Sequence, residues 1–318
     1  MIEPIFKAVL SAAEKQRGAV HCDELRDVHN AIAELPHDHA LALRLKIADS
    51  MSEIESPAGA GLLGIWLGAS VENGMDPEPT IQPLLQTMLR WTRSMVTLDD
   101  DEKEDPDPDE EVVTGTELLG QSLVAHISRA PSARNQLRDE PNLVAELQRV
   151  EHLTAGAAWL SELLRKCSGE LIVLHAQEPR GVRVEYKNIS NCFHLFTLLQ
   201  GALTDFPGAL KSTKQVLAAA KGESFDDVSD NAWWHFGQGN VPEADIGGSV
   251  FGEASPDSIS RVDDQQVMLL WPPILQGRSW NSGFFAPVLS SALPSVKKLN
   301  DLTSDEIAQW REKLQLPS

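Results

Sequence analysis

Residues 170–189 read ELIVLHAQEPRGVRVEYKNI, and this stretch decides the fold class because the helical pattern of the chain gives way there. Residues 170–176 form a short apolar run, residues 177–181 have the composition of a turn, and apolar and charged residues alternate over 182–189. In a strand, Val182, Val184 and Tyr186 point to one face, while Arg183, Glu185 and Lys187 point to the other. The pattern predicts a β-hairpin with one buried face.

A helix, another strand and a closing helix follow the hairpin. Apolar residues at helical spacing predict a helix at 192–203, and residues 266–271 (QVMLLW) predict a strand that stops at Pro272 and Pro273. Thr303 and Glu306 fit a capping box, in which each side chain binds a free backbone amide of the other residue. We therefore expect an α+β module with one small sheet over residues 114–318.

Residues 1–98 read as helix throughout. Apolar residues recur at i, i+3, i+4 and i+7, and the helices are expected to start near residues 2, 23, 38, 59 and 80. Helix pairs thus recur about every 40 residues, which is the unit length of helical solenoids, although no residue motif repeats. The expected fold class is mainly α: an all-helical, solenoid-like N-terminal module plus the α+β module.

Three glycines lie inside the fourth of these helices, at Gly61, Gly64 and Gly68. A glycine inside a helix costs about 1 kcal/mol relative to alanine, so some other interaction must compensate for it. A phosphate-binding loop requires Lys followed by Ser or Thr after the glycines, and no such pair follows. The glycines therefore predict the close approach of a neighbouring helix.

Nearly half of the formal charge of −20 lies in one short segment. Residues 99–111 contain ten acidic side chains and one lysine, and Pro106 and Pro108 prevent a continuous helix. We expect residues 99–113 to be a flexible acidic linker between the two domains. Glu-C should cut this linker before any other segment. Its exposure would also permit a partner protease to release one domain.

Composition also restricts the compartment and the partners. Three cysteines, an odd number, favour free thiols in a reducing cytoplasm, and we expect a bacterial protein. No signal peptide is visible, and the longest apolar run, residues 59–71, is shorter than the roughly 20 residues that a bilayer requires. Basic residues are too scattered for direct nucleic-acid binding. We expect no association with a membrane or with nucleic acid.

The sequence lacks the established catalytic motifs. Residues 247–252 (GGSVFG) differ from a nucleophile elbow by one extra residue after Ser249. His37 and His39 are two residues apart and do not share a helix face, so no metal site is expected there. No P-loop and no G-x-G-x-x-G motif after a strand is present, and no cofactor is expected. The best-placed polar set is Cys192, His175 and His194. A thiol at a helix start gains thiolate character and a histidine could act as its base. The flanking Phe193, Leu195 and Phe196 nevertheless favour a core position for Cys192.

Residues 233–285 are rich in aromatic residues, glycine and proline, and they hold the residues that we expect to contact a partner or ligand: Trp234, His235, Arg278, Trp280 and Asn281. Residues 278–283 are predicted to form a loop at the end of the sheet, and such loops carry binding residues on a rigid base. Arg278 presents a planar set of donors that suits a carboxylate or a phosphate. The alternative is that Arg278 pairs with Asp263 or Asp264 and that Trp280 belongs to the core.

These observations favour a non-catalytic cytoplasmic binding or adaptor protein whose partner is another protein. One alternative is a thiol-dependent hydrolase or transferase that uses Cys192 with His175 or His194. A second alternative is an acidic decoy that occupies nucleic-acid-binding proteins, although decoys require charge on a rigid surface rather than in a linker.

Overall fold

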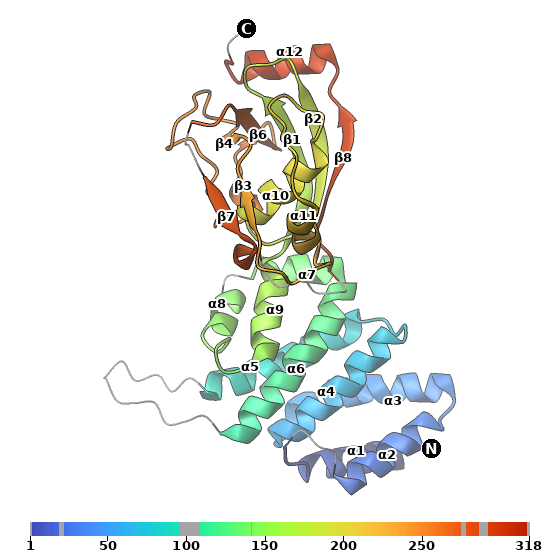
Figure 1. The fold of residues 1–318 in the computed structure, drawn as a ribbon. Coiled ribbons are helices and arrows are strands. Elements are labelled where there is room, and N and C mark those ends of the chain that lie inside the picture. The colour runs from blue at the N-terminus through green and yellow to red at the C-terminus, as the bar shows by residue number, and fades with distance from the viewer. Residues whose placement is uncertain are drawn as a thin grey trace. The chain divides into compact units, whose positions relative to one another are not determined.

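The computed structural model describes residues 2–18, 22–95, 109–140, 142–274, 278–285 and 292–316. The chain divides into two compact units, Met1–Leu164 and Arg165–Ser318 (Figure 1). The first unit is helical in its described residues, and the second contains a mixed sheet with helices.

The first unit contains all five of the helices predicted before the acidic segment. They are followed by four more, so that the unit comprises α1 (Ile2–Glu14), α2 (Asp23–Ala33), α3 (His37–Asp49), α4 (Pro57–Glu72), α5 (Glu78–Met95), α6 (Glu110–Arg129), α7 (Pro131–Arg138), α8 (Leu143–Gln148) and α9 (Ala155–Arg165). A short 3₁₀ turn, η1 (Met51–Glu53), joins α3 to α4.

Helix α6 begins earlier than the sequence predicts. Asp109 caps it by accepting a hydrogen bond from the backbone N–H of Glu111 at 2.8 Å, so residues 110–113 form its first turn and are not part of a linker. Acidic residues are favourable there because the N-terminus of a helix carries partial positive charge. The remainder of the predicted linker, up to residue 108, lies outside the described residues. The division between the compact units falls at residues 164/165, whereas we expected it at the acidic segment.

Close helix packing explains why α6 belongs with the N-terminal helices. A Cβ atom built on Gly61 would lie 3.0 Å from the Cα atom of Gly115, and one built on Gly115 would lie 2.3 Å from the carbonyl oxygen of Pro57. Along α6, a Cβ atom on Gly120 would lie 2.4 Å from the carbonyl carbon of Gly156 in α9. The prediction that the glycines of α4 allow a neighbouring helix to approach closely is confirmed.

The second unit is built on a sheet with the strand order β4-β6-β1-β2-β8. Its strands are β1 (Cys167–His175), β2 (Gly181–Ile189), β4 (His235–Gln238), β6 (Gln265–Trp271) and β8 (Ser295–Asp301), with β5 (Arg261–Val262) paired to β6. Strands β1 and β6 run parallel, and the other strand pairs of this sheet are antiparallel. Two short strands, β3 (Ser229–Asn231) and β7 (Ser279–Asn281), form a separate pair.

The predicted hairpin is confirmed as the antiparallel pair β1 and β2, with Leu171 opposite Val184. Val182, Val184 and Tyr186 are buried, and Lys187 on the other face is exposed. The strand predicted at 266–271 is β6, which joins the hairpin as a parallel neighbour of β1. The loop predicted at 278–283 needs correction, because residues 279–281 pair with β3 to form β7.

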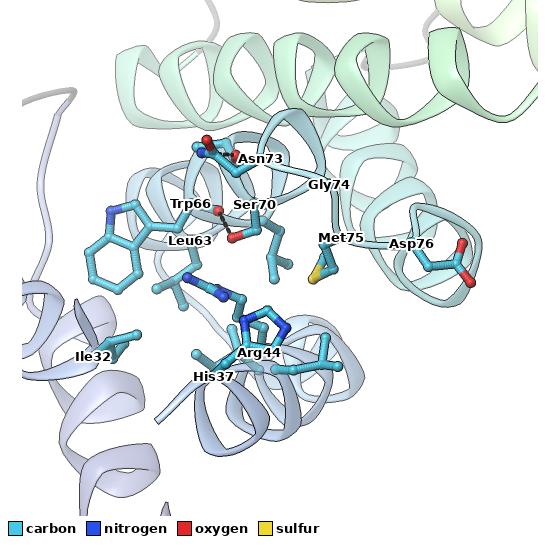
Figure 2. Close-up of a pocket in the computed structure, with 14 residues that line it drawn as sticks. Ile32, His37, Arg44, Leu63, Trp66, Ser70, Asn73, Gly74, Met75 and Asp76 are labelled. Atoms are coloured by element: carbon cyan, nitrogen blue, oxygen red, sulfur yellow. Dashed lines mark hydrogen bonds between the residues drawn. The ribbon is translucent and has the colours of Figure 1, made fainter. Parts of the chain in front are cut away.

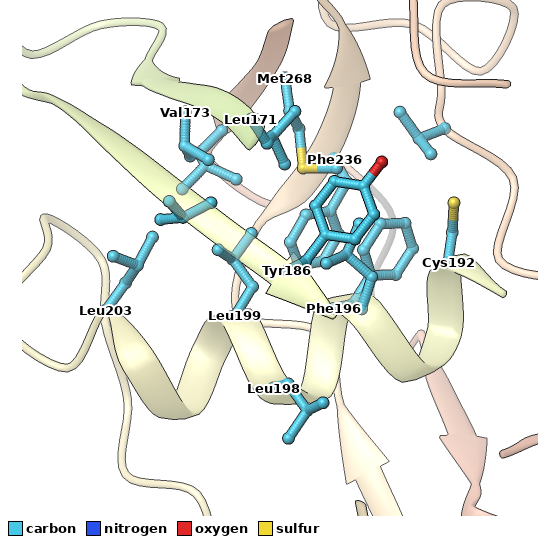
Figure 3. Close-up of a cluster of buried hydrophobic side chains, with 14 of the residues drawn as sticks. Leu171, Val173, Tyr186, Cys192, Phe196, Leu198, Leu199, Leu203, Phe236 and Met268 are labelled. Carbon is cyan, nitrogen blue, oxygen red and sulfur yellow. The ribbon is translucent and has the colours of Figure 1, made fainter. Parts of the chain in front are cut away.

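Helices cover the sheet through two apolar clusters. Helix α10 (Cys192–Ala202) packs Phe196 and Leu199 against Leu171, Val184 and Phe236, and the rings of Phe196 and Phe236 stack at 3.9 Å (Figure 3). Helix α12 (Ser304–Lys313) contributes to the second cluster, which is formed by Ile172, Leu174, Val267, Leu269, Leu302 and Ile307. The predicted capping box of Thr303 and Glu306 starts α12, and α11 (Lys214–Lys221) packs against α10.

Candidate functional site

The three residues of the predicted thiol site do not form a cluster. His175 ends β1, whereas Cys192 lies near Cys167, which begins the same strand. Eight residues separate the two ends, and at about 3.3 Å per residue they are about 26 Å apart. His175 instead accepts hydrogen bonds at Nδ1 from the backbone N–H groups of Gln177 and Glu178, and it thereby holds the hairpin turn.

The surroundings of Cys192 stabilise its protonated form. Its side chain is fully buried at the start of α10, beside the aromatic core (Figure 3). Burial, together with smaller contributions from the nearby Cys167 and Asp257, raises the pKa of the thiol to about 12. A thiol in this environment lacks the thiolate character that nucleophilic catalysis requires.

His194 also has a structural role. Its Nε2 atom lies 2.6 Å from the carbonyl oxygen of Ala220, and its ring stacks on Phe285 at 4.9 Å. Burial lowers its pKa to about 4, although the bond to Ala220 opposes this shift. His194 is therefore a neutral imidazole that links α10 to the end of α11.

Three of the five predicted contact residues are buried. Trp234 and Trp280 are core residues that donate from Nε1 to the carbonyl oxygen of Pro207 and to Oγ1 of Thr197, at 2.7 and 2.8 Å. His235 is 3% exposed. Asn281 is half-buried, and its side chain accepts a hydrogen bond from the backbone N–H of Gly283.

His235 belongs to a polar cluster that the sequence did not reveal. Oγ of Ser249 lies 3.4 Å from Nε2 of His235 and donates to the carbonyl oxygen of Asp245 at 3.1 Å. The pKa of His235 is lowered, mainly by burial and also by the charge of Arg278. Because the serine proton is directed to a carbonyl group, this arrangement fixes the loop at 245–249 and does not prepare Ser249 as a nucleophile.

Arg278 is half-buried, and its guanidinium lies 5.8 Å from the ring centre of Phe196. Burial lowers its pKa, and the negative charge of Glu253 opposes this effect. Among the described residues, no carboxylate forms an ion pair with Arg278. Asp263 pairs with Lys313, and Asp264 accepts from Arg261 through its backbone carbonyl; neither carboxylate pairs with Arg278.

Two loops hold the start of α10 between them. The backbone N–H groups of Cys192 and Phe193 donate to the carbonyl oxygens of Ala254 and Gly252, at 2.9 and 2.7 Å. On the other side, Nδ2 of Asn191 donates to the carbonyl oxygen of Phe284 at 2.6 Å. A Cβ atom on Gly252 would lie 2.2 Å from the ring of Phe193, so only glycine fits there.

Each loop exposes one phenylalanine. Phe251 is 60% exposed and Phe284 is 50% exposed, and the ring of Phe284 lies 5.2 Å from that of Phe193. Glu253 follows Phe251 in its loop and acts electrostatically on Arg278. We call Phe251, Glu253, Arg278 and Phe284 the aromatic rim. The sequence predicted only Arg278 of this rim, because local sequence does not show whether a phenylalanine in an irregular segment is exposed.

A scan of protein-family models, a search of curated proteins and a search of solved structures find no match to this chain. Within the described ranges, no helix is both long and apolar enough to cross a membrane. The same residues contain no group of three or more His, Cys, Asp or Glu side chains arranged to hold a metal ion.

Proposed function

We infer that this protein is a non-catalytic binding protein that contacts another protein through the aromatic rim. The observation that carries this proposal is the pair of exposed phenylalanines, Phe251 and Phe284, on two loops that are both hydrogen-bonded to the start of α10. Exposed aromatic side chains on a rigid base are typical of interaction sites, and aromatic residues and arginine are enriched in protein interfaces.

The charge of the rim supports a partner with a carboxylate beside an apolar group. Arg278 has no ion-pair partner in the described part of the chain, and its planar set of donors can bind a carboxylate through two parallel hydrogen bonds. Glu253 would remain at the edge of such a contact, where it disfavours partners with a second acidic group nearby.

We propose a cytoplasmic location, which the three free cysteines support, since two of them are buried without forming a disulfide. We also propose that the helices of the first unit stack in a solenoid-like manner, which the helix starts recurring about every 40 residues support. The decoy alternative depends on the acidic segment, most of which lies outside the described residues, and it stays a prediction.

The test places a photo-crosslinking amino acid at position 251, 284 or 225 of the full-length protein in living cells. Phe225 is the matched control because it is 95% exposed in the same unit but is not part of the rim. We expect the same partner protein to crosslink from positions 251 and 284, and not from 225. Equal crosslinking from all three positions would contradict the proposal.

Affinity for that partner is then measured with purified variants. Phe284→Ala and Arg278→Ala should each weaken binding at least tenfold, which is about 1.4 kcal/mol, while Phe225→Ala should leave it unchanged. If Arg278→Ala lowers the melting temperature and leaves the affinity as it was, Arg278 serves the scaffold and the rim is wrongly assigned.

A further inference from the structure

The helical unit contains a cavity of about 540 Å³ that the aromatic rim does not involve. It lies between α2, α3, α4 and the turn that leads into α5 (Figure 2). Residues of α3 and α4 form most of its lining, together with Met75 and Asp76 of the turn. Cavities that bind small molecules have volumes of about 300 to 1,000 Å³.

The walls of this cavity are mostly apolar. Leu63 and Leu67 form its buried floor, and the half-buried side chains of Leu41, Trp66 and Met75 surround them. Methionine adapts its shape to an apolar guest, because its side chain is unbranched and polarisable. A ligand must therefore carry an apolar body.

One charged side chain lines the interior without a partner of its own. Arg44 extends from α3 toward α4, is half-buried, and makes no hydrogen bond or ion pair with the residues that the structure describes (Figure 2). Arg90 in the same unit shows the contrast, because its guanidinium donates to the carbonyl oxygens of Ser52 and Ile54 at 2.5 and 2.6 Å. The guanidinium of Arg44 remains free to bind an anion.

Two other polar side chains of the cavity are hydrogen-bonded to the backbone of α4. Oγ of Ser70 donates to the carbonyl oxygen of Trp66 at 2.7 Å, and Nδ2 of Asn73 donates to that of Ala69 at 2.8 Å. The carboxylate of Asp76 accepts from the backbone N–H of Glu78 at the start of α5, at 3.1 Å. It forms no ion pair with Arg44 among the described residues. His37, exposed at the start of α3, is positioned to add a second donor.

We propose that this cavity binds a small carboxylate with an unbranched or aromatic apolar body, in which Arg44 holds the carboxylate and Leu63, Trp66 and Met75 cover the body. The planar fork of a guanidinium matches the two oxygens of a carboxylate, and such charged pairs are about twice as strong as neutral hydrogen bonds. This site is independent of the aromatic rim.

The probe is octanoate, titrated into the full-length protein by calorimetry, with 1-octanol and octyl phosphate as companions of equal chain length. We expect saturable 1:1 binding of octanoate. 1-Octanol, which has the same body without the charge, should bind at least tenfold more weakly. Equal affinity for octanol and octanoate, or tighter binding of octyl phosphate than of octanoate, overturns the assignment of a carboxylate.

Variants then locate the site. Arg44→Gln should weaken octanoate binding at least tenfold, Arg44→Lys should weaken it less, and neither change should affect the affinity for octanol. Ala69→Phe places a ring in the cavity from an exposed position and should abolish binding of both ligands. Arg26→Gln, which removes an exposed arginine paired with Asp23 on α2, is the control and should change the affinity less than twofold. Unchanged octanoate binding by a folded Arg44→Gln protein refutes the proposal.

Discussion

Replacing Gly115 by alanine should destabilise the helical unit, although alanine is the better helix former. The substitution favours α6 by about 1 kcal/mol through helix propensity. It also places a methyl group 2.3 Å from the carbonyl oxygen and 2.5 Å from the carbonyl carbon of Pro57, both of which are backbone atoms of α4. Overpacking of this kind costs about 1–3 kcal/mol, and the rigid contact puts Gly115 at the upper end of that range or beyond it.

The expected net loss is about 2 kcal/mol. For a domain of about 150–250 residues, this corresponds to a decrease in melting temperature of about 4–8 °C. Thermal unfolding followed by circular dichroism at 222 nm measures the change, and urea unfolding provides the free energy independently.

Gly64→Ala is the matched control because it makes the same change inside α4. Its new methyl group crowds Cδ2 of Leu119 at 3.0 Å, the far end of a flexible side chain that can move away, while its other neighbours, in Leu84 and Ser122, lie at ordinary contact distances of 3.5 and 3.6 Å. The gain in helix propensity should then offset the crowding, and the melting temperature should stay within about 2 °C of the wild type. If Gly115→Ala is as stable as Gly64→Ala, the close approach of α4 and α6 is not what holds them together.

Three further predictions concern the second unit. His194 has a pKa of about 4 when folded and about 6.5 when unfolded, so acidification from pH 6.5 to 4.5 protonates the unfolded chain first and costs roughly 2 kcal/mol of stability. His194→Gln should flatten this pH dependence of the free energy of unfolding, while the control His39→Gln, at an exposed position, should leave it unchanged. Equal slopes in the wild type and both variants would contradict the assignment of the effect to His194. Iodoacetamide at neutral pH should alkylate Cys22 in the native protein and leave Cys192 unmodified until the protein unfolds, as measured by peptide mass spectrometry. Rapid and selective labelling of Cys192 would instead support a thiol-dependent enzyme. Tyr186→Phe removes the 2.6 Å hydrogen bond to Oε1 of the buried Gln266, so urea unfolding should show a decrease of about 1–3 kcal/mol in the free energy of unfolding. A decrease near zero would mean that water replaces the hydroxyl group.

The sequence by itself determined the elements that local chemistry specifies. The hairpin at 170–189, the strand at 266–271 and the first five helices were predictable, because apolar periodicity reports directly on which face of an element is buried. The glycines of α4 predicted a close neighbour because glycine in a helix is unfavourable without one. The capping box at Thr303 was also predictable, because both of its hydrogen bonds form within four residues of the chain.

Only the tertiary structure decided which residues are exposed and which lie close together. Local sequence did not distinguish the buried Trp280 from the exposed Phe284, because the residues that they contact, Thr197 and Phe193, are distant in the sequence. The short strand β7 depends on its pairing with β3 about 50 residues earlier, and its own sequence has no apolar periodicity. Arg44 and Arg90 look alike in the sequence, yet one faces an apolar cavity and the other binds carbonyl groups of a preceding turn. Burial and charge pairing are properties of contacts between distant segments, so they become defined only when the chain has folded.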